Sequence, residues 1–311
     1  MRGHIGAAVL GLICALSLTG CSGASVTSGA ATAPARPGDN SSTTSPGASR
    51  PTATPPTAAT RAHLADATVN VAEGAHVGVG MPISVTFKRP IPEPERADVE
   101  RLLKVTANPG VTGAWAWIKD RNLHDGQRVD FRPESYWKPG TKVSLTAGPS
   151  IARSFTVARS LVATVDVRSH TMTVVRDGEA TRTIPITAGG PGYDTWNGTM
   201  VVSDKQRRVY MDSRTVDIAD SYQGWYSYAV HLTTSGTYLH ENDRANTLAG
   251  RSNVTHGCIG LASDGTARGF YEQVIPGDVI RVTNSKDTVA AGNGYGDWNL
   301  SWSEWRSRSA L

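Results

Sequence analysis

The chain has 311 residues, with 31 Lys and Arg against 27 Asp and Glu, which gives a formal net charge of +4. This length predicts more than one folded domain. The charge is small and forms no basic cluster, which excludes nucleic acid as the expected partner. It fits an anionic cell envelope, although a soluble basic protein whose charge serves no function is the simpler interpretation.

The first segment, residues 1–20, has the form of an export signal. A positively charged start is followed by an apolar run from Ile5 to Leu18 and then by Leu18-Thr19-Gly20-Cys21. The run is shorter than the ~20 residues that span a bilayer as a helix, so we expect a signal peptide. Its end resembles the bacterial lipobox, which implies that Cys21 is lipidated and anchors the protein to the outer face of the cell membrane. Ordinary cleavage, with Cys21 incidental, is the alternative.

Residues 21–62 are mostly Ser, Thr, Ala, Pro and Gly. Such a segment cannot bury enough apolar surface to offset the entropy of ordering, so we expect a disordered spacer.

Residues 63–158 read as a small β sandwich. Short alternating segments broken by Gly and Pro predict strands at Ala67–Val71, Pro82–Phe87 and Lys142–Thr146. One helix is expected from Glu93 to Leu103. Trp115 and Trp117 lie on one strand face, where they would pack in the core or against another domain. No set of catalytic side chains stands out, so this region is expected to be a spacer or a binding module.

Residues 159–286 form a second β-rich region. Strands are predicted at Leu161–Val167, Thr171–Val175, Thr181–Thr187, Val209–Met211 and Ala229–Leu232. Asp177-Gly178 predicts a hairpin turn, and a helix is expected from Gly265 to Val274. The Gly-rich stretch Ala188–Tyr193 lacks the Lys-Ser/Thr and the helix of a phosphate-binding loop, so a mobile loop near a site is favoured.

Cysteine usage points to one reactive group. Cys14 and Cys21 belong to the export signal, so the folded part carries one thiol, Cys258. A lone cysteine in an exported protein is either incidental or reactive. The thiolate is the nucleophile, and a thiol needs a nearby base or cation to form it.

Cys258 ends the stretch Thr255-His256-Gly257-Cys258. Along an extended chain His256 lies on the same side as the thiol, and His240 follows a predicted strand from which it could reach across the fold. Gly257 leaves backbone N–H groups able to face a developing oxyanion. These parts suit acyl transfer through a thioester.

Other interpretations of the same residues exist. Each histidine taken alone is more often a surface or hydrogen-bonded residue than a catalyst. His240, His256 and Cys258 are zinc ligand types, but their spacing matches no zinc pattern, so neither a metal nor another cofactor is expected.

His240 and Thr255-His256-Gly257-Cys258, separated by residues 241–254, resemble the signature of L,D-transpeptidases with a YkuD-type catalytic domain. The tryptophan-rich tail, residues 294–306, is similar to that of actinobacterial members, which are lipoproteins with immunoglobulin-like domains. The resemblance covers about residues 160–305. It implies a mainly β protein: an immunoglobulin-like sandwich over 63–158, a catalytic domain over 159–286 with one or two short helices, and a C-terminal segment, 287–311, packed on that domain.

By this resemblance, Cys258 attacks the bond between the diamino acid and the terminal D-Ala of a peptidoglycan tetrapeptide stem. An amine of a second stem then resolves the thioester into a 3→3 cross-link. His240 would be the general base, and His256 would support the thiolate. Carbapenems acylate the family's cysteine, so Cys258 should react with them. An L,D-carboxypeptidase using water, or a non-catalytic wall-binding module, are the alternatives.

The resemblance also implies the residues around the nucleophile. Thr255, Gly257, Tyr222 and Tyr238 are the expected oxyanion and substrate-binding residues, with backbone N–H groups at Gly257 and Cys258 forming the oxyanion hole. Residues 189–222 would form a flap over the donor peptide.

Two positions depart from the family pattern. Gly260 replaces an Asn that helps to hold the catalytic loop, which puts the rigidity of this loop in question. Glu241 replaces a Ser or Gly after the first histidine, and its carboxylate is expected to point to solvent.

Overall fold

The computed structural model describes residues 57–216 and 222–311. The predicted signal peptide and Cys21 lie outside these residues. Helix α1 (Ala58–Ala65) begins inside the predicted spacer, so the expectation of disorder is wrong for residues 58–62. The Thr57 hydroxyl caps this helix by accepting from the Thr60 N–H, and Leu64 is buried in the core of the first sandwich. These contacts order the end of a segment whose composition alone suggested none.

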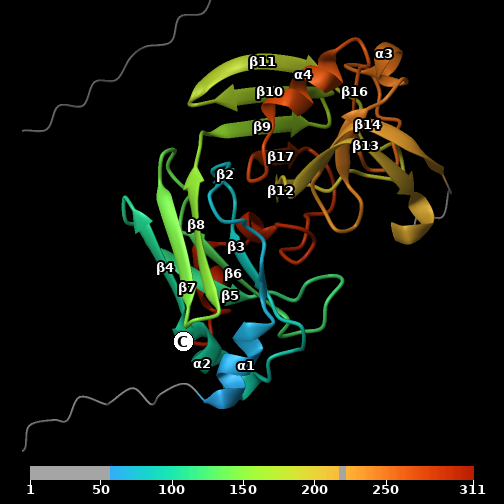
Figure 1. The fold of residues 1–311 in the computed structure, drawn as a ribbon. Helices are drawn as coiled ribbons and strands as arrows, with labels where there is room; N and C mark the ends of the chain where they lie inside the picture. Colours follow the sequence, from blue (N-terminus) through green and yellow to red (C-terminus); the bar gives the residue numbers. More distant parts are fainter. Residues whose placement is uncertain (1–56, 217–221) are drawn as a thin grey trace, which may run out of the picture. The chain divides into compact units, whose positions relative to one another are not determined.

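The first domain is the predicted sandwich of two four-stranded sheets (Figure 1). One sheet has the order β1 (Thr68–Val69), β3 (Ile83–Thr86), β6 (Arg128–Pro133), β5 (Gly113–Trp117). The other has the order β2 (Ala75–Val77), β8 (Ile151–Val157), β7 (Lys142–Ala147), β4 (Leu103–Asn108). Helix α2 (Glu93–Leu102) confirms the expected helix. Trp115 and Trp117 are both buried, as predicted.

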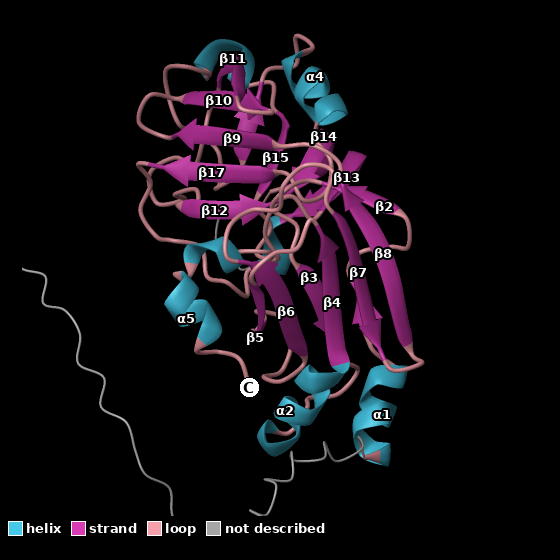
Figure 2. Ribbon diagram, turned by 90° about the vertical axis from the view of Figure 1, so that its left-hand side faces the viewer, coloured by secondary structure: helices cyan, strands magenta, loops and turns pink. Residues whose placement is uncertain are grey.

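The second domain also contains two sheets (Figure 2). The larger has the order β11 (Glu179–Pro185), β10 (Thr171–Arg176), β9 (Leu161–Asp166), β17 (Val279–Thr283), β12 (Gly198–Val201). The smaller has the order β13 (Asp204–Asp212), β14 (Gln223–His231), β15 (Tyr238–Glu241), β16 (Ile259–Leu261). Helix α4 (Thr266–Gln273) confirms the expected helix, and the structure adds the short helix α3 (Ala245–Leu248). Asp177 and Gly178 both have positive φ, as a hairpin turn of this kind requires.

The C-terminal segment contacts both domains. Asn299 in the 3₁₀ turn η2 (Asp297–Asn299) exchanges hydrogen bonds with the backbone of Thr199, so the segment begins on the catalytic domain as expected. The tryptophans of this segment contact the first domain instead. The Trp298 indole donates to the Gly80 carbonyl (2.8 Å), and Trp305 in α5 (Trp302–Arg306) donates to the Ala114 carbonyl (2.9 Å).

The tryptophan side chains therefore pack on the sandwich, which corrects the expectation that the whole segment lies on the catalytic domain. Trp305 is fully buried against Ala116 and Ile118. The chain ends beside α2 (Figure 1). There the Ala310 N–H donates to the Glu100 carboxylate (2.8 Å). A buried indole needs both apolar surface and an acceptor, and this edge of the sandwich offers both.

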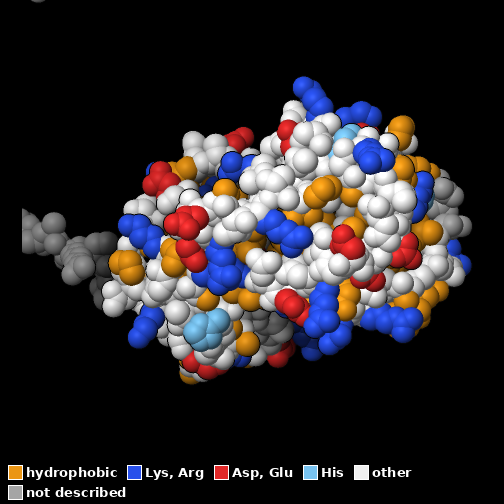
Figure 3. Space-filling view, turned by 90° about the horizontal axis from the view of Figure 1, so that it is seen from above, with side chains coloured by type: hydrophobic (Ala, Val, Ile, Leu, Met, Phe, Trp, Pro, Cys, Tyr) orange, Lys and Arg blue, Asp and Glu red, His pale blue; other side chains and the backbone are white. Residues whose placement is uncertain are grey.

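Charges of both signs are interspersed on the face of the described residues that Figure 3 presents, in agreement with the small net charge. Within residues 57–216 and 222–311, no helix is long and apolar enough to cross a membrane.

Candidate active site

The fold brings His240 and Cys258 together through two neighbouring parallel strands. β15 carries His240, and β16 begins directly after Cys258, with His240 opposite Gly260 in the register. Both side chains line one cavity of about 190 Å³. The thiol lies 3.6 Å from the Gly236 carbonyl, to which the S–H donates. The sequence placed both residues in the site, and only the strand pairing brings them to one cavity.

His240 is held in one tautomer. Its Nδ1 lies 2.6 Å from the Glu241 carbonyl oxygen, which can only accept, so Nδ1 carries the hydrogen and Nε2 keeps its lone pair. Burial of the ring lowers the pKa of His240 to about 4, against a small opposing effect of this hydrogen bond. The imidazole is therefore neutral at physiological pH and able to accept a proton at Nε2.

The departure at Glu241 does not disturb this arrangement. The backbone carbonyl, rather than the side chain, orients the ring, so any residue at this position provides the same acceptor. The Glu241 side chain is half-buried, and burial raises the pKa of its carboxyl.

Cys258 is a buried thiol in the resting site. Burial raises the pKa of Cys258 to about 11, although a hydrogen bond from the Tyr238 backbone N–H opposes this. A neutral thiol thus shares the cavity with a neutral imidazole. Two neutral groups of this kind suit a proton transfer that accompanies attack by the sulfur.

The backbone between His256 and Cys258 is not extended, although the sequence predicts an extended path. Gly257 has φ +110°, so the chain turns between His256 and Cys258 instead of running extended. Only glycine adopts this conformation readily. The His256 ring lies between those of Tyr193 and Tyr222, at centroid distances of 4.6 and 5.0 Å, and lines two cavities. It forms a shared wall between them.

Thr255 braces the catalytic loop from inside. Its hydroxyl donates to the Cys258 carbonyl (2.6 Å) and accepts from the Gly257 N–H (3.3 Å). The Gly257 N–H is therefore hydrogen-bonded within the loop, whereas the family resemblance implied that it faces an oxyanion. The Thr255 backbone also pairs with the Gly-rich stretch, through bonds to Ala188 and Gly190. This stretch lies beside the site, as predicted.

Gly260 fits a position where a side chain has no room. A Cβ atom there would lie 2.8 Å from Cγ2 of Thr187 and 3.0 Å from Cβ of Asn242. The backbones of Gly260 and Thr187 exchange two hydrogen bonds, of 2.7 and 3.1 Å. Thr187 also accepts from the Val254 N–H. These contacts hold the loop whose rigidity the departure at Gly260 put in question.

Tyrosines form the rest of the cavity wall. Tyr222 lies against His256, as described, and the half-buried Tyr238 provides the N–H that faces the thiol. Tyr226, which sequence reasoning missed, packs its ring 4.7 Å from that of His240. Tyr222 directly precedes β14 and Tyr226 lies within it. Their even spacing along extended chain places both side chains on one face, a signal that could have identified Tyr226.

A third histidine, His231, was also missed and packs against Tyr238. The rings of His231 and Tyr238 are stacked 4.3 Å apart at an angle of 7°. His231 Nδ1 lies 2.9 Å from the Asp204 carboxylate, and Nε2 lies 2.8 Å from the Thr233 carbonyl. Both ring nitrogens of His231 therefore have a hydrogen-bond partner, which fixes the ring against Tyr238.

Comparison with known proteins identifies the family. The model of the L,D-transpeptidase catalytic domain matches residues 160–282, and that of a bacterial Ig domain matches residues 40–148, which begins before the boundary expected at residue 63. L,D-transpeptidase 1 of Mycobacterium tuberculosis is 36% identical over 220 residues, which are 70% of this chain and 84% of that protein. The chain belongs to the L,D-transpeptidases.

Other members of the L,D-transpeptidase family are similar over different lengths. L,D-transpeptidase 2 of Mycobacterium tuberculosis is 31% identical over 80% of this chain, which spans 63% of that relative. The structure of the LD transpeptidase LdtMt1 in complex with imipenem matches with a TM-score of 0.62 and 34% sequence identity. The match covers 70% of this chain and 97% of the chain in that structure. L,D-transpeptidase 3 from Mycobacterium tuberculosis has a TM-score of 0.61, with 32% identity, and covers 71% of this chain and 100% of that chain.

Proposed function

We propose that this protein forms 3→3 cross-links in peptidoglycan by acyl transfer through a thioester on Cys258. The observation that carries the proposal is the pairing of the thiol with a neutral, tautomerically fixed His240 in one cavity. Membership of the L,D-transpeptidases supports the substrate class, a tetrapeptide stem as donor and a second stem as acceptor.

The reaction has two halves that use the same base. His240 Nε2 takes the thiol proton as Cys258 Sγ attacks the carbonyl carbon of the donor's diamino acid. The C–N bond to D-Ala breaks, and the imidazolium returns the proton to the leaving amine. An acceptor amine then attacks the thioester carbonyl and gives its proton to His240. The C–S bond breaks, and the sulfur leaves as thiolate, which the imidazolium reprotonates.

Carbapenem acylation tests the nucleophile and the base. Relatives have been crystallised with imipenem and with a faropenem-derived adduct. We expect a carbapenem to add one equivalent of mass to this protein, because Sγ opens the β-lactam amide and its nitrogen takes the proton. Cys258→Ala should abolish the adduct. His240→Ala should slow adduct formation by roughly 10²–10⁴-fold if His240 is the base.

The same measurement can contradict these roles. An adduct that persists in Cys258→Ala would remove the assignment, and an unchanged rate in His240→Ala would move the role of the base to His256. Trp225→Ala is a suitable control, because this side chain is 59% exposed and lines neither cavity that contains His256.

A transpeptidase and a carboxypeptidase differ in the group that attacks the thioester, which is an amine in the first and water in the second. Incubation with a disaccharide-tetrapeptide, followed by mass analysis, distinguishes three results: a cross-linked dimer, a tripeptide or no reaction. We expect the dimer. Tripeptide alone would indicate an L,D-carboxypeptidase, and binding without turnover would indicate a wall-binding module.

We also propose that Cys21 carries the lipid anchor and that the protein acts at the outer face of the cell membrane. The support is the apolar run ending in Leu-Thr-Gly-Cys. Cys21→Ala should release the protein from the membrane fraction, whereas retention there would contradict lipidation.

A further inference from the structure

We propose that Arg244 binds the carboxylate of the D-Ala that leaves the donor stem, and that it thereby selects donors whose last residue is a free acid. This inference rests on the proposed transpeptidation and extends it to the specificity of the donor site. Two observations carry it: the position of one cation beside the catalytic thiol, and the place of the carboxylate relative to the bond that breaks.

Arg244 lines the same cavity as the catalytic pair. The cavity of about 190 Å³ contains His240 and Cys258, and Arg244 is part of its wall. Among the described residues that line this cavity, Arg244 is the only Lys, Arg, Asp or Glu. The catalytic pair is neutral at rest, because burial disfavours the charged form of both groups. The wall therefore offers a permanent positive charge to an anionic group of the donor.

The turn after β15 brings Arg244 to this wall. The Asn242 side chain accepts from the Arg244 N–H (3.0 Å), and the Asn242 N–H donates to the Leu261 carbonyl of β16 (2.9 Å). An Asn side chain that bonds the backbone two residues further on is typical of a tight turn. Ala245, the first residue of α3, is buried directly after it. The backbone of Arg244 is thus tied to the two parallel strands of the site.

The guanidinium is held at one nitrogen and keeps other donors for a ligand. Its Nη1 donates to the Val254 carbonyl (3.1 Å), directly before Thr255 of the catalytic loop. Within residues 57–216 and 222–311, no carboxylate forms an ion pair with it. Arg244 is exposed, so a substrate can reach it. A guanidinium has five N–H groups in one plane, and two parallel hydrogen bonds from it can bind a carboxylate.

The donor carries a carboxylate close to the bond that breaks. In the D-Ala leaving group, one carbon is bonded both to the nitrogen of the scissile amide and to the carboxylate. When Sγ of Cys258 contacts the carbonyl carbon, this carboxylate therefore lies within one residue of the sulfur. The cavity is smaller than the ~300–1,000 Å³ of pockets that enclose drug-sized ligands. A group one residue from the thiol thus stays beside the wall to which Arg244 contributes the charge.

Carbapenems carry a carboxylate at the equivalent position. The carbon that bears this carboxylate is bonded to the lactam nitrogen, the atom that leaves the carbonyl carbon when the ring opens. The contact with Arg244 should therefore assist acylation by a carbapenem as well. A carbapenem and its methyl ester form a pair of probes that examines Arg244 without any peptide.

Donor selectivity tests the proposal. The full folded chain is incubated with a disaccharide-tetrapeptide that ends in D-Ala or in D-alaninamide, and kcat/KM is measured from release of the terminal residue. We expect the wild type to prefer the free acid. Arg244→Gln should reduce this preference roughly tenfold or more, because a charged hydrogen bond is lost. Arg244→Lys should retain part of it, since lysine keeps the charge but not the planar pair of donors.

The matched control is Arg251→Gln. Arg251 is an exposed arginine of the same segment between β15 and β16, and it lines neither cavity that contains His256. The substitution makes the same change of charge and should leave the preference of the wild type unaltered. The carbapenem and its methyl ester are then compared in the same variants, with the acylation rate as the readout.

The two pairs of compounds separate the outcomes. Arg244→Gln should slow the reactions of the free-acid donor and the carbapenem acid, and leave those of the amide and the ester nearly unchanged. Equal losses with both members of a pair would mean that Arg244 only braces the catalytic loop, and no loss would mean that it does not contact the carboxylate. Either result would overturn the proposal. A wild type that releases neither D-Ala nor D-alaninamide would contradict the proposed transpeptidation, while the carbapenem pair would still decide the role of Arg244.

Discussion

At the scale of single residues, the catalytic pair is neutral at rest, and this sets its pH dependence. The low pKa of His240, about 4, keeps the base form available in acid, and the high pKa of Cys258, about 11, keeps the thiol protonated in mild base. Both directions follow from burial, which disfavours the charged form of each group.

We therefore predict a broad plateau in the rate of carbapenem acylation, from about pH 5 to about pH 10. The rate should fall only as pH approaches 4, because protonation of His240 then removes the base. Stopped-flow measurement of the β-lactam absorbance across this range provides the check. A midpoint near 6.5, the value of an unperturbed histidine, would contradict the buried, neutral imidazole.

Gly260 allows a test of how the catalytic loop is braced. Gly260→Ala places a methyl group within 2.8 Å of Thr187 Cγ2, so we predict a loss of roughly 1–3 kcal/mol in the free energy of unfolding. Thr187→Ser removes that methyl group and keeps the hydroxyl that bonds Val254 and Ser252. Chemical denaturation of both single variants and the double variant should show partial recovery in the double variant. Additive losses would show that the contact does not limit this position.

At the scale of elements, the C-terminal segment links the two domains through its indoles. Trp305 is fully buried. The Arg132 guanidinium carbon lies over its indole, 4.6 Å from the ring centroid. Arg132 also lies over Trp298 and Trp302. This arrangement uses one cation for three rings and joins α5 to β6 of the sandwich.

Trp305→Ala should lower the free energy of unfolding by about 3–5 kcal/mol, since it leaves a cavity in a fully buried position. The control is Trp225→Ala, because Trp225 is 59% exposed and should change stability by less than about 1 kcal/mol. Equal losses in the two variants, measured by denaturant titration, would mean that α5 does not anchor the segment.

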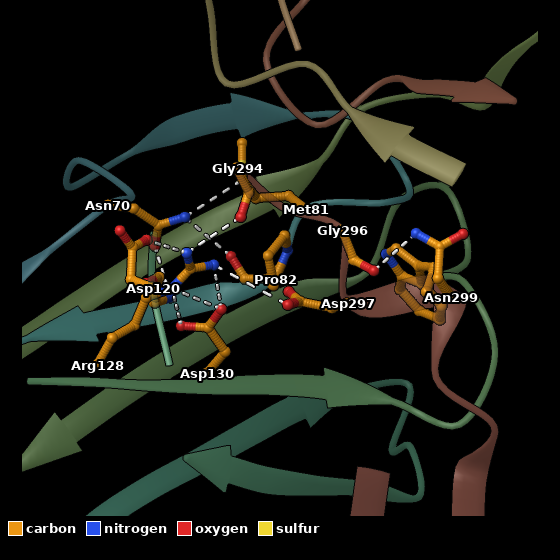
Figure 4. A network of polar contacts seen from close by, with 12 residues as sticks. Asn70, Met81, Pro82, Asp120, Arg128, Asp130, Gly294, Gly296, Asp297 and Asn299 are labelled. Carbon is orange, nitrogen blue, oxygen red and sulfur yellow. Dashed lines mark hydrogen bonds and ion pairs between the residues drawn. The ribbon is translucent and has the colours of Figure 1, made fainter. Parts of the chain in front are cut away.

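At the scale of the whole molecule, a cluster of buried charges connects the Ig-like domain to the C-terminal segment, which also contacts the catalytic domain. Arg128 is almost fully buried beside Asp120, Asp130 and Asp297 (Figure 4). Burial lowers the pKa of Arg128, but the charges of Asp130 and Asp297 outweigh this effect and raise it. Asp297 is completely buried, and its pKa is raised above the usual range. Burial is the larger cause, and the negative charge of the nearby Asp130 is the second. Removal of the cation would leave these carboxylates without compensation.

We predict that Arg128→Leu costs about 3–5 kcal/mol and uncouples the two domains. The wild type should unfold in one calorimetric transition, and the variant should show two. Arg101→Leu, on the exposed face of α2, is the control and should leave a single transition. One transition in Arg128→Leu would indicate that the tryptophan contacts alone couple the domains.

Much of this protein could be predicted from local sequence. Alternation of apolar residues predicted β3, β7, β9 and β10, because side chains on a strand point to opposite faces in turn. The export signal, the single thiol and the order of His240 and Thr255-His256-Gly257-Cys258 pointed to thioester chemistry, since these depend on residue type and spacing alone. The disorder expected for residues 58–62 and the extended path from His256 to Cys258 were wrong, because a helix cap and a positive φ decide them.

The sequence by itself thus determined the kind of chemistry and the two-domain β architecture. The tertiary structure decided the neutral state of the catalytic pair, the fit of Gly260 against Thr187 and the path of the tryptophans. Each of these depends on burial or on contacts between segments far apart in the chain. No local pattern of residues encodes such contacts, because the partner is set by the fold and not by neighbouring positions.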